Sequence, residues 1–220
     1  MGPPGSGKGT LSLMCIEKFG WGWLSTGDLC RFHIAQSTPI GLTVDSIIKS
    51  GNLIPDDLVV EMVFDWLVTS GASYDTILLD GCPRTVLQAE KLYALMQKNY
   101  VNPVSMTIIR LLLPDEQVVQ RLMNRYICSS LQCKSIYTKE QLEKNKDNCA
   151  LCEKCQSKLI RRVDDTEKII RDRLATYYKY EHELLAFYEA CNIPVITCKT
   201  NKPLEHVFNE FKNSVECVSI

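Results

Sequence analysis

A glycine-rich run with one lysine stands at the start of the sequence. Residues 2–10 read Gly-Pro-Pro-Gly-Ser-Gly-Lys-Gly-Thr, which fits the pattern G-x-x-x-x-G-K from Gly2 to Lys8. In such a loop the backbone N–H groups can wrap around phosphate oxygens, because glycine has no side chain to collide with them. The lysine adds a point charge near the β- and γ-phosphates, and the N-terminal end of the following helix faces them. These residues predict a site for the phosphates of a nucleotide.

Two further positions bear on a metal ion at this site. A hydroxyl residue usually follows the lysine of such a loop, but here Gly9 follows it and the hydroxyl comes one place later, at Thr10. Direct ligation of magnesium by that hydroxyl is therefore not expected. Residues 76–80 form an apolar run that ends in Asp80, which predicts a buried parallel strand with a carboxylate at its C-terminal edge. A carboxylate in that place can reach a magnesium ion bound with the nucleotide, often through water.

Apolar periodicity predicts the elements that must hold these residues in position. Buried strands are expected at 76–80, 104–113 and 193–198. Apolar residues at helical spacing predict helices at 11–19, 57–68, 115–125, 165–190 and 203–215. Strands that alternate with helices of this length predict an α/β fold, in which a parallel sheet is flanked by helices.

Two stretches do not follow this alternation. Residues 26–55 have no strong strand pattern, and residues 126–164 are polar and rich in lysine and cysteine. Both are expected to be inserts on the ligand-binding edge of the sheet. A phosphate-binding loop normally follows a buried central strand, whereas only Met1 precedes it here. We therefore expect that a first strand of roughly 5–10 apolar residues is missing from this sequence.

Length and composition narrow the class of protein. The 220 residues allow one domain with smaller inserts. The 25 Lys+Arg against 26 Asp+Glu give a net charge of −1, so a broad basic surface for nucleic acid is not expected. No stretch reaches the roughly 18–20 apolar residues of a membrane span, and no leader pattern stands at the start. We expect a cytoplasmic monomer that binds neither nucleic acid nor a membrane.

Cysteine is unusually frequent, with 11 residues in the chain. Five of them are clustered: Cys128, Cys133, Cys149, Cys152 and Cys155. Clustered cysteines with C-x-x-C spacing are typical of a metal site, and tetrahedral zinc needs four such ligands. The spacing leaves the choice open, because Cys152 can form a chelating pair either with Cys149 or with Cys155.

The chain resembles the adenylate kinase family of nucleoside monophosphate kinases over essentially its whole length. The resemblance lies in motifs that keep the family's order and spacing, at residues 2–10, 25–31, 51–56, 80–85 with Gln88, Arg121, Arg125, 162–165 and Arg173. It implies a core P-loop domain made of residues 1–25, 56–125 and 165–220. It also implies a small helical insert for the monophosphate at 26–55 and a zinc-ribbon-like lid at 126–164.

The resemblance implies a set of charged residues that act on the phosphates. Phosphoryl transfer needs charge neutralisation and in-line positioning, and the planar fork of arginine suits phosphate oxygens. Arg31 and Arg84 are expected to hold the AMP phosphate, and Asp164 and Asp165 match paired carboxylates at the lid hinge that could orient other arginines. The residues expected to be catalytic are Lys8, Asp80, Arg84, Arg121, Arg125, Arg162 and Arg173.

The same resemblance implies the contacts of both nucleotides. The residues expected to bind ATP are Gly5, Ser6, Gly7, Lys8, Gly9, Thr10, Arg125, Ile136, Tyr137 and Lys202. The residues expected to bind AMP are Thr26, Arg31, Asn52, Leu53, Ile54, Gly81, Cys82, Pro83, Arg84, Gln88, Arg162 and Arg173. Cys82 stands where the family usually has an aromatic residue, and we expect that alkylation of its thiol inhibits the enzyme.

The resemblance also favours one set of metal ligands. Metal-bearing lids in the family use one cysteine pair at the start of the lid and another just before the Arg-x-Asp-Asp motif. This pattern favours Cys128, Cys133, Cys152 and Cys155, with Cys149 spare, although the first pair is two residues further apart than is usual. The zinc is expected to be structural, because so polar a lid buries little apolar surface.

The expected reaction is the magnesium-dependent conversion of ATP and AMP into two ADP. A GTP:AMP kinase or a UMP/CMP kinase would use the same residues and is the nearest alternative. A zinc-ribbon nucleic-acid-binding protein with a vestigial P-loop is an alternative of another class. Residues 126–160, however, have six lysines against four acidic residues and two tyrosines as their aromatics, a poor surface for following phosphates. A degenerate kinase kept as a binding scaffold is the third alternative, which only the missing strand favours.

Overall fold

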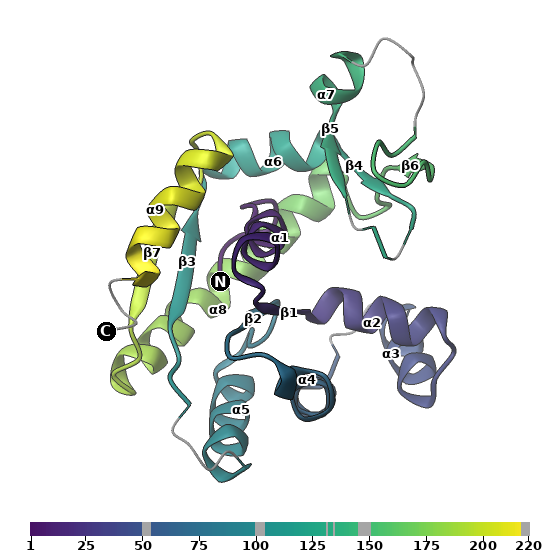
Figure 1. Ribbon diagram of the computed structural model, residues 1–220. Helices are drawn as coiled ribbons and strands as arrows, with labels where there is room; N and C mark the ends of the chain where they lie inside the picture. Colours follow the sequence, from purple (N-terminus) through teal and green to yellow (C-terminus); the bar gives the residue numbers. More distant parts are fainter. Residues whose placement is uncertain (50–53, 100–103, 131, 134, 145–150, 217–220) are drawn as a thin grey trace.

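The computed structural model describes residues 1–49, 54–99, 104–130, 132–133, 135–144 and 151–216. Figure 1 shows a core of helices and strands from which two smaller parts project, one built on α2 and α3 and the other on β4, β5 and β6. Within the described ranges no helix is long and apolar enough to cross a membrane.

The elements alternate along the chain. The helices are α1 (Lys8–Phe19), α2 (Thr26–Ala35), α3 (Pro39–Lys49), α4 (Asp56–Thr69), α5 (Val86–Asn99), α6 (Asp115–Met123), α7 (Lys139–Lys144), α8 (Glu167–Ala190) and α9 (Leu204–Glu216), with a short 3₁₀ helix at Gly71–Ser73. The strands are β1 (Gly22–Ser25), β2 (Ile77–Asp80), β3 (Ile108–Leu112), β4 (Arg125–Cys128), β5 (Ile136–Thr138), β6 (Leu159–Ile160) and β7 (Val195–Lys199).

The core strands are parallel and form two hydrogen-bonded pairs. β1 pairs with β2, so that Ser25 lies opposite Asp80, and β3 pairs with β7. Met1 lies beside β3, where its carbonyl accepts a hydrogen bond from the Leu111 N–H at 2.9 Å. Because parallel strands bring their carboxyl ends to one edge, the glycine-rich loop, Ser25 and Asp80 gather at that edge, where ligands bind in open α/β sheets.

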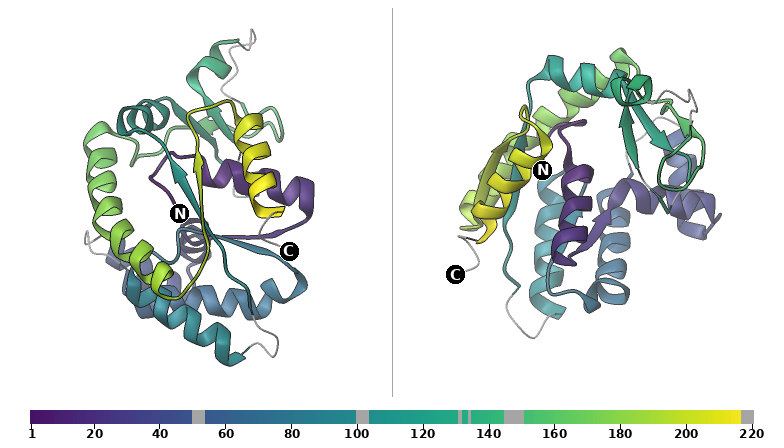
Figure 2. Two further views of the ribbon diagram at one scale, coloured as in Figure 1. Left: turned by 90° about the vertical axis from the view of Figure 1, so that its left-hand side faces the viewer. Right: turned by 45° about the horizontal axis from the view of Figure 1, so that its top comes forward.

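Alternating side chains bury an apolar layer on each side of these strands. Leu78 and Leu111 belong to a cluster with residues of α1 and α9, centred on Phe211. Ile77 and Leu79 pack instead with residues of α4 and α5. Figure 2 shows β3 and β7 between α9 and the long α8. This layered arrangement confirms the predicted α/β fold, a parallel sheet flanked by helices.

The structure also differs from the predicted elements. The expected strands correspond to β2, β3 and β7, but β1 and α5 were not predicted. The helix expected at 115–125 ends at Met123, and Arg125 begins strand β4 instead. The reason is tertiary, because Arg125 pairs with Thr138 in the antiparallel sheet β5-β4-β6.

The two projecting parts have different cores. α2 and α3 pack on each other and on α4 through the buried side chains of Cys30, Val44 and Met62. The sheet β5-β4-β6 packs instead around Tyr137, Leu159 and the buried cysteines. The division into domains at 26–55 and 126–164 stays a prediction.

A buried ion pair ties α8 to the core strand β3. The Arg110 guanidinium donates from Nε to Glu181 Oε1 at 2.9 Å, and the Tyr177 hydroxyl donates to the same oxygen. Glu181 is only 7% exposed. The hydrogen bond to Glu181 raises the pKa of Arg110. The contact fixes the position of the helix whose N-terminal half carries Arg173.

We expect that the substitution Glu181→Gln lowers the free energy of unfolding by about 2 kcal/mol, because it leaves the Arg110 charge without its partner in a partly buried place. Denaturant unfolding followed by circular dichroism measures this effect. Glu183→Gln, on an exposed position two residues further along α8, is the matched control and should change it by less than about 0.5 kcal/mol. Equal stability of the two variants would contradict the structural role of the ion pair.

Candidate functional site

The glycine-rich loop has the geometry that a phosphate-binding loop requires. Gly5 and Gly7 have φ values of 75° and 95°, a region that side chains other than glycine rarely adopt. A Cβ atom built on Gly7 would meet nothing within 4 Å, so the backbone there is open to a ligand. Gly7 precedes the first turn of α1, which contains Lys8, Gly9 and Thr10. The backbone N–H groups at this helix start can therefore be offered to phosphate oxygens.

Lys8 lies over this loop. Its ammonium donates hydrogen bonds to the carbonyls of Gly2 and Pro3, at 2.9 and 3.0 Å. The Ser6 hydroxyl is completely buried and has no hydrogen-bond partner among the described residues. Phosphate oxygens could give both side chains stronger, charge-assisted partners.

The electrostatic surroundings of Lys8 show which predicted residues the fold brings together. Desolvation lowers the pKa of Lys8 to about 8, and the positive charges of Arg84, Arg173 and Arg125 act in the same direction. The carboxylate of Asp80, at the end of β2, opposes them. Asp80 and three of the predicted arginines thus lie close enough to act on Lys8. This is the arrangement that binding of several phosphate groups requires.

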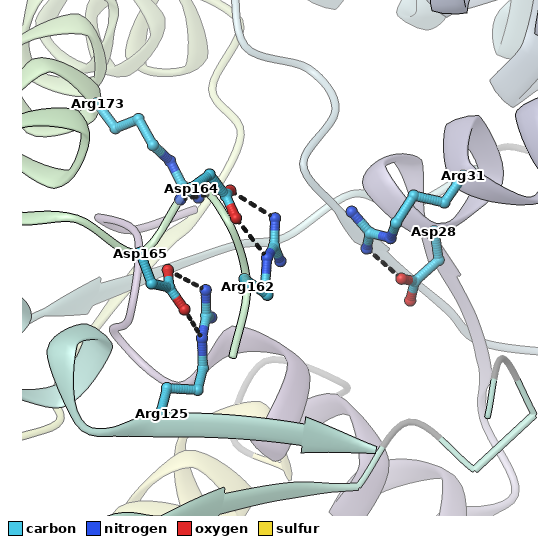
Figure 3. A network of polar contacts seen from close by, with 7 residues as sticks. All are labelled: Asp28, Arg31, Arg125, Arg162, Asp164, Asp165 and Arg173. Carbon is cyan, nitrogen blue, oxygen red and sulfur yellow. Dashed lines mark hydrogen bonds and ion pairs between the residues drawn. The ribbon is translucent and has the colours of Figure 1, made fainter. Parts of the chain in front are cut away.

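Carboxylates at the start of α8 hold three of the predicted arginines (Figure 3). Arg125 binds Asp165 in a bidentate manner, with Nε and Nη2 at 2.9 and 2.7 Å from its two oxygens. Arg162 binds Asp164 in the same way, at 2.8 and 2.7 Å, and Arg173 donates to Asp164 at 3.0 Å.

The surroundings of Asp164 favour its ionised form. Burial opposes the ionisation of Asp164, but the hydrogen bonds and charges of Arg162 and Arg173 outweigh it and keep the pKa of this carboxyl below its usual value. Asp165 is only 2% exposed, so its two hydrogen bonds with Arg125 lie largely out of water. Planar bidentate pairs of this kind fix the direction of each guanidinium.

A second group of predicted residues lies across the site, at the carboxyl ends of β1 and β2. Arg31 forms an ion pair with Asp28 on α2, and Arg84 donates from Nε to the Gly81 carbonyl at 2.7 Å. Figure 3 shows the pair of Arg31 and Asp28 apart from the arginines held by Asp164 and Asp165. Two separate sets of arginines therefore face this edge of the core.

The predicted AMP side also contains a fixed amide. Gln88 is 4% exposed; its Nε2 donates to Asp56 at 2.7 Å and its Oε1 accepts from the Arg84 N–H at 2.8 Å. Thr26 is buried nearby, and its hydroxyl has no hydrogen-bond partner in the part of the chain that the structure describes. Ile54 packs against the α2–α4 cluster. Asn52 and Leu53, predicted to bind AMP, lie outside the described residues.

The Gly81–Cys82–Pro83 turn follows β2, and the Cys82–Pro83 peptide bond is cis. Cys82 is 5% exposed, and burial raises the pKa of its thiol to about 12. The thiolate is the reactive form of cysteine, so the structure favours slow alkylation of this residue. The expected inhibition by alkylation stays a prediction. A reagent can reach the buried thiol of Cys82 only if the thiol becomes exposed.

The residues predicted to contact the base of ATP differ in their exposure to solvent. Ile136 is 43% exposed, whereas Tyr137 is 8% exposed and its hydroxyl lies beside Cys152. Lys202 forms an exposed ion pair with Glu210 on α9. Arg121 donates to the Thr200 carbonyl at 2.6 Å, which ties α6 to the end of β7. The roles of Ile136, Tyr137 and Lys202 in ATP binding stay predictions, as does the catalytic role of Arg121.

Sequence reasoning missed two acidic partners in the site. Asp28 and Asp56 both stand within quoted motifs, but their roles as partners of Arg31 and Gln88 were not predicted. The spacing of three residues between Asp28 and Arg31 on one helix could have indicated the first pair. Nothing in the spacing of Asp56 and Gln88, 32 residues apart, could have indicated the second.

Four of the five clustered cysteines converge at one point of the sheet β5-β4-β6. The Sγ atoms of Cys128, Cys133, Cys152 and Cys155 all lie within 4.8 Å of one another. The printed sequence offers Cys149 as a fifth candidate, but it lies outside the described residues. Tetrahedral zinc with Zn–S bonds of about 2.3 Å places its sulfur atoms about 3.8 Å apart. The four thiols thus have the chemistry and approximate spacing of a zinc site.

The fold and the site together define the class of protein. It is a P-loop protein of the nucleoside monophosphate kinase type, with a parallel sheet, a glycine-rich loop at its carboxyl edge and two projecting parts that carry arginines. Comparison with known proteins identifies the family. The family model described as "Adenylate kinase" matches residues 1–193. The chain belongs to the adenylate kinase family.

Individual relatives are similar over nearly the whole chain. The adenylate kinase of Chlamydia muridarum is 36% identical over 98% of this chain and 85% of its own length. The adenylate kinase of Clostridium tetani is 33% identical over 100% of this chain and 98% of its own length. The adenylate kinase of Borrelia garinii is 35% identical over 87% of this chain and 85% of its own length. Similarity of this extent covers nearly all of the chain.

The lowered pKa of Lys8 predicts how nucleotide binding depends on pH. Below a pKa of about 8 the side chain is a charged ammonium, and above it the ammonium is lost. If the complex keeps Lys8 charged, the affinity for a triphosphate should fall about tenfold between pH 7 and pH 9. Calorimetric titration with a non-hydrolysable ATP analogue measures this change.

Lys8→Met is the control for this experiment, because it removes the titrating group. Its affinity should be weaker than that of the unmodified protein at pH 7 and nearly independent of pH over the same range. Identical pH profiles for both proteins would show that Lys8 is not the group responsible.

Proposed function

We propose that this protein transfers the terminal phosphoryl group of ATP to AMP, reversibly and with magnesium, to give two molecules of ADP. The observation that carries the proposal is the group of Lys8, Arg125, Arg162 and Arg173 around one edge of the sheet, with the arginines held by Asp164 and Asp165. The relatives named adenylate kinase support the choice of reaction.

The residues would promote the transfer by position and charge. The reacting phosphates carry several negative charges, and the oxygens that attack and leave must lie in line. Lys8 and the loop backbone would hold the donor phosphates, while Arg31 and Arg84 would hold the phosphate of AMP from the opposite side. Arg125, Arg162 and Arg173 would neutralise the group in transfer. No general base is needed, because the attacking phosphate is already ionised.

Magnesium would enter with the nucleotide. It would supply charge neutralisation at the phosphates. Asp80 is the carboxylate placed to hold it, through water, since it ends β2 within range of the Lys8 charge. Gly9 provides no side chain for this purpose, and Thr10 lies one position further along α1.

The four cysteines would hold a structural zinc ion. The small sheet β5-β4-β6 has few other means of stabilisation, because its buried residues are mainly the cysteines, Tyr137 and Leu159. A metal that links the strands would replace the apolar core that this part of the chain lacks. That the protein acts as a monomer in the cytoplasm, without nucleic acid or membrane, stays a prediction from the sequence.

The reaction is tested by a coupled assay of ADP formation. AMP, GMP, UMP and CMP serve in turn as acceptors, with ATP or GTP as the donor. We expect the highest kcat/KM with ATP and AMP; a preference for GTP as donor, or for UMP or CMP as acceptor, would replace the proposed substrate pair by one of the alternatives. No transfer with any pair would contradict the proposed function.

The role of Lys8 is tested in the same assay. Lys8→Ala should lower kcat/KM by roughly 100-fold or more, because it removes a charge at the phosphates. Lys18→Ala, at an exposed position in the last turn of the same helix, is the matched control and should keep normal activity. Unchanged turnover of Lys8→Ala would refute the mechanism.

The metal is tested by elemental analysis of protein purified without chelators. We expect one zinc per chain, and its removal should lower the melting temperature by several degrees. Cys152→Ser should abolish stoichiometric zinc binding, whereas Cys191→Ser, on a half-buried cysteine outside the cluster, should keep it. Protein that is free of metal and equally stable with or without zinc would contradict the proposed site.

A further inference from the structure

One buried hydroxyl lies against the cysteine cluster, and the sequence had predicted another role for it. Tyr137 stands on β5 and is 8% exposed. Its hydroxyl oxygen is 3.4 Å from Cys152 Sγ, and it accepts a hydrogen bond from the Glu153 N–H at 3.1 Å. The phenol therefore lies between the loop that follows Cys152 and the sulfur of Cys152 itself.

The direction of the contact with Cys152 follows from the chemistry of a metal site. A metal-bound cysteine is a thiolate, which has no proton to give. The Glu153 N–H already supplies the hydrogen that the phenol oxygen accepts, so the hydroxyl proton is left to point at sulfur. The result is a chain of two hydrogen bonds in one direction, from the Glu153 N–H to the Tyr137 oxygen and from the Tyr137 hydroxyl to the Cys152 thiolate.

We propose that Tyr137 positions the lid metal site: its hydroxyl donates to the Cys152 thiolate, strengthens metal binding and slows metal release. The inference rests on the proposed zinc site and deepens it. Hydrogen bonds to ligand atoms orient the ligand and stabilise its charge, and their loss typically costs 10–100-fold in metal affinity. Other hydrogen bonds to the cluster include those from the Ser130 N–H to Cys128, between the Ser135 hydroxyl and Cys133, and from the backbone of Lys154 and Cys155 to Cys152.

The position of Tyr137 links this hydrogen bond to the phosphate site. In the antiparallel pair of β4 and β5, Tyr137 lies opposite Tyr126, and the next residue, Thr138, lies opposite Arg125. Arg125 is the arginine that binds Asp165. A phenol anchored to the metal site therefore holds the strand register beside a predicted catalytic arginine.

The test uses the full chain loaded with Co²⁺ in place of Zn²⁺, since tetrahedral cobalt thiolates absorb in the visible and near-ultraviolet. Tyr137→Phe keeps the ring and removes only the hydroxyl. Its thiolate-to-cobalt band should move to lower energy, because an unbonded thiolate is the better electron donor. Release of zinc to a chromophoric chelator should be roughly tenfold faster than from the unmodified protein.

Tyr126→Phe is the matched control in the facing strand. Tyr126 packs beside the same cluster, and no hydrogen bond from its hydroxyl to a cysteine is found among the described residues. It should leave both the spectrum and the rate of zinc release unchanged. If Tyr137→Phe behaves like Tyr126→Phe while the unmodified protein shows the tetrathiolate spectrum, the role of Tyr137 is refuted and the metal site stands. If the unmodified protein gives no tetrathiolate spectrum, the metal site itself fails, and the inference with it.

A measurement on the unmodified protein covers the case in which Tyr137→Phe does not fold. With an NMR-active cadmium isotope in the site, the Tyr137 hydroxyl proton should exchange slowly with solvent and couple to the metal through the hydrogen bond. A Tyr137 hydroxyl that exchanges freely while cadmium is bound would overturn the proposal.

Discussion

The structure depends on offsetting the electrostatic repulsion between several positive charges that lie near one another. The charges of Arg84, Arg125 and Arg173 all act on Lys8, Arg125 also acts on Arg173, and desolvation adds to the cost. Two like charges 4 Å apart repel by about 4 kcal/mol at an effective dielectric constant of 20. The two carboxylates of residues 164 and 165 offset this repulsion, because each lies within hydrogen-bond distance of at least one guanidinium. The net charge of −1 of the chain therefore hides a strong local separation of charge.

The same ion pairs join the lid sheet to the core. The chain enters that sheet at Arg125, directly after α6, and leaves it through residues 161–165 just before α8. Both connections thus end in the group of charges, and Arg161 adds a hydrogen bond to the Met123 carbonyl at the end of α6. Asp164 and Asp165 and their arginines therefore stand at the two connections between this sheet and the core. Under the proposed function, phosphate oxygens would compete with these carboxylates for the same guanidinium groups.

The sequence predicted the parts of this site that depend on local pattern. The glycine-rich loop and the strand ending at Asp80 were found where the local pattern predicted them. Spacing alone predicted a cysteine cluster but left its members open, and the four cysteines that converge are the set that the family resemblance favoured. The strand β1 has four residues, and its identity comes from pairing with β2, more than 50 residues later in the chain. The sequence pattern predicts that Arg125 ends a helix, but Arg125 is a strand residue because it pairs with Thr138 in the antiparallel sheet. Long-range partners of this kind leave no periodic signal in the sequence.

Gly5 shows that the phosphate loop is also part of the protein's packing. A Cβ atom there would lie 2.9 Å from Cγ of Leu122, a fully buried residue of α6. The residue is thus constrained both by its φ of 75° and by a neighbour on the helix that leads to Arg125. The glycine-rich loop and α6 are in direct van der Waals contact at this point. A glycine that looks like a ligand-binding residue is equally a spacer between the loop and α6, so its invariance in a mutational screen would report packing as much as chemistry.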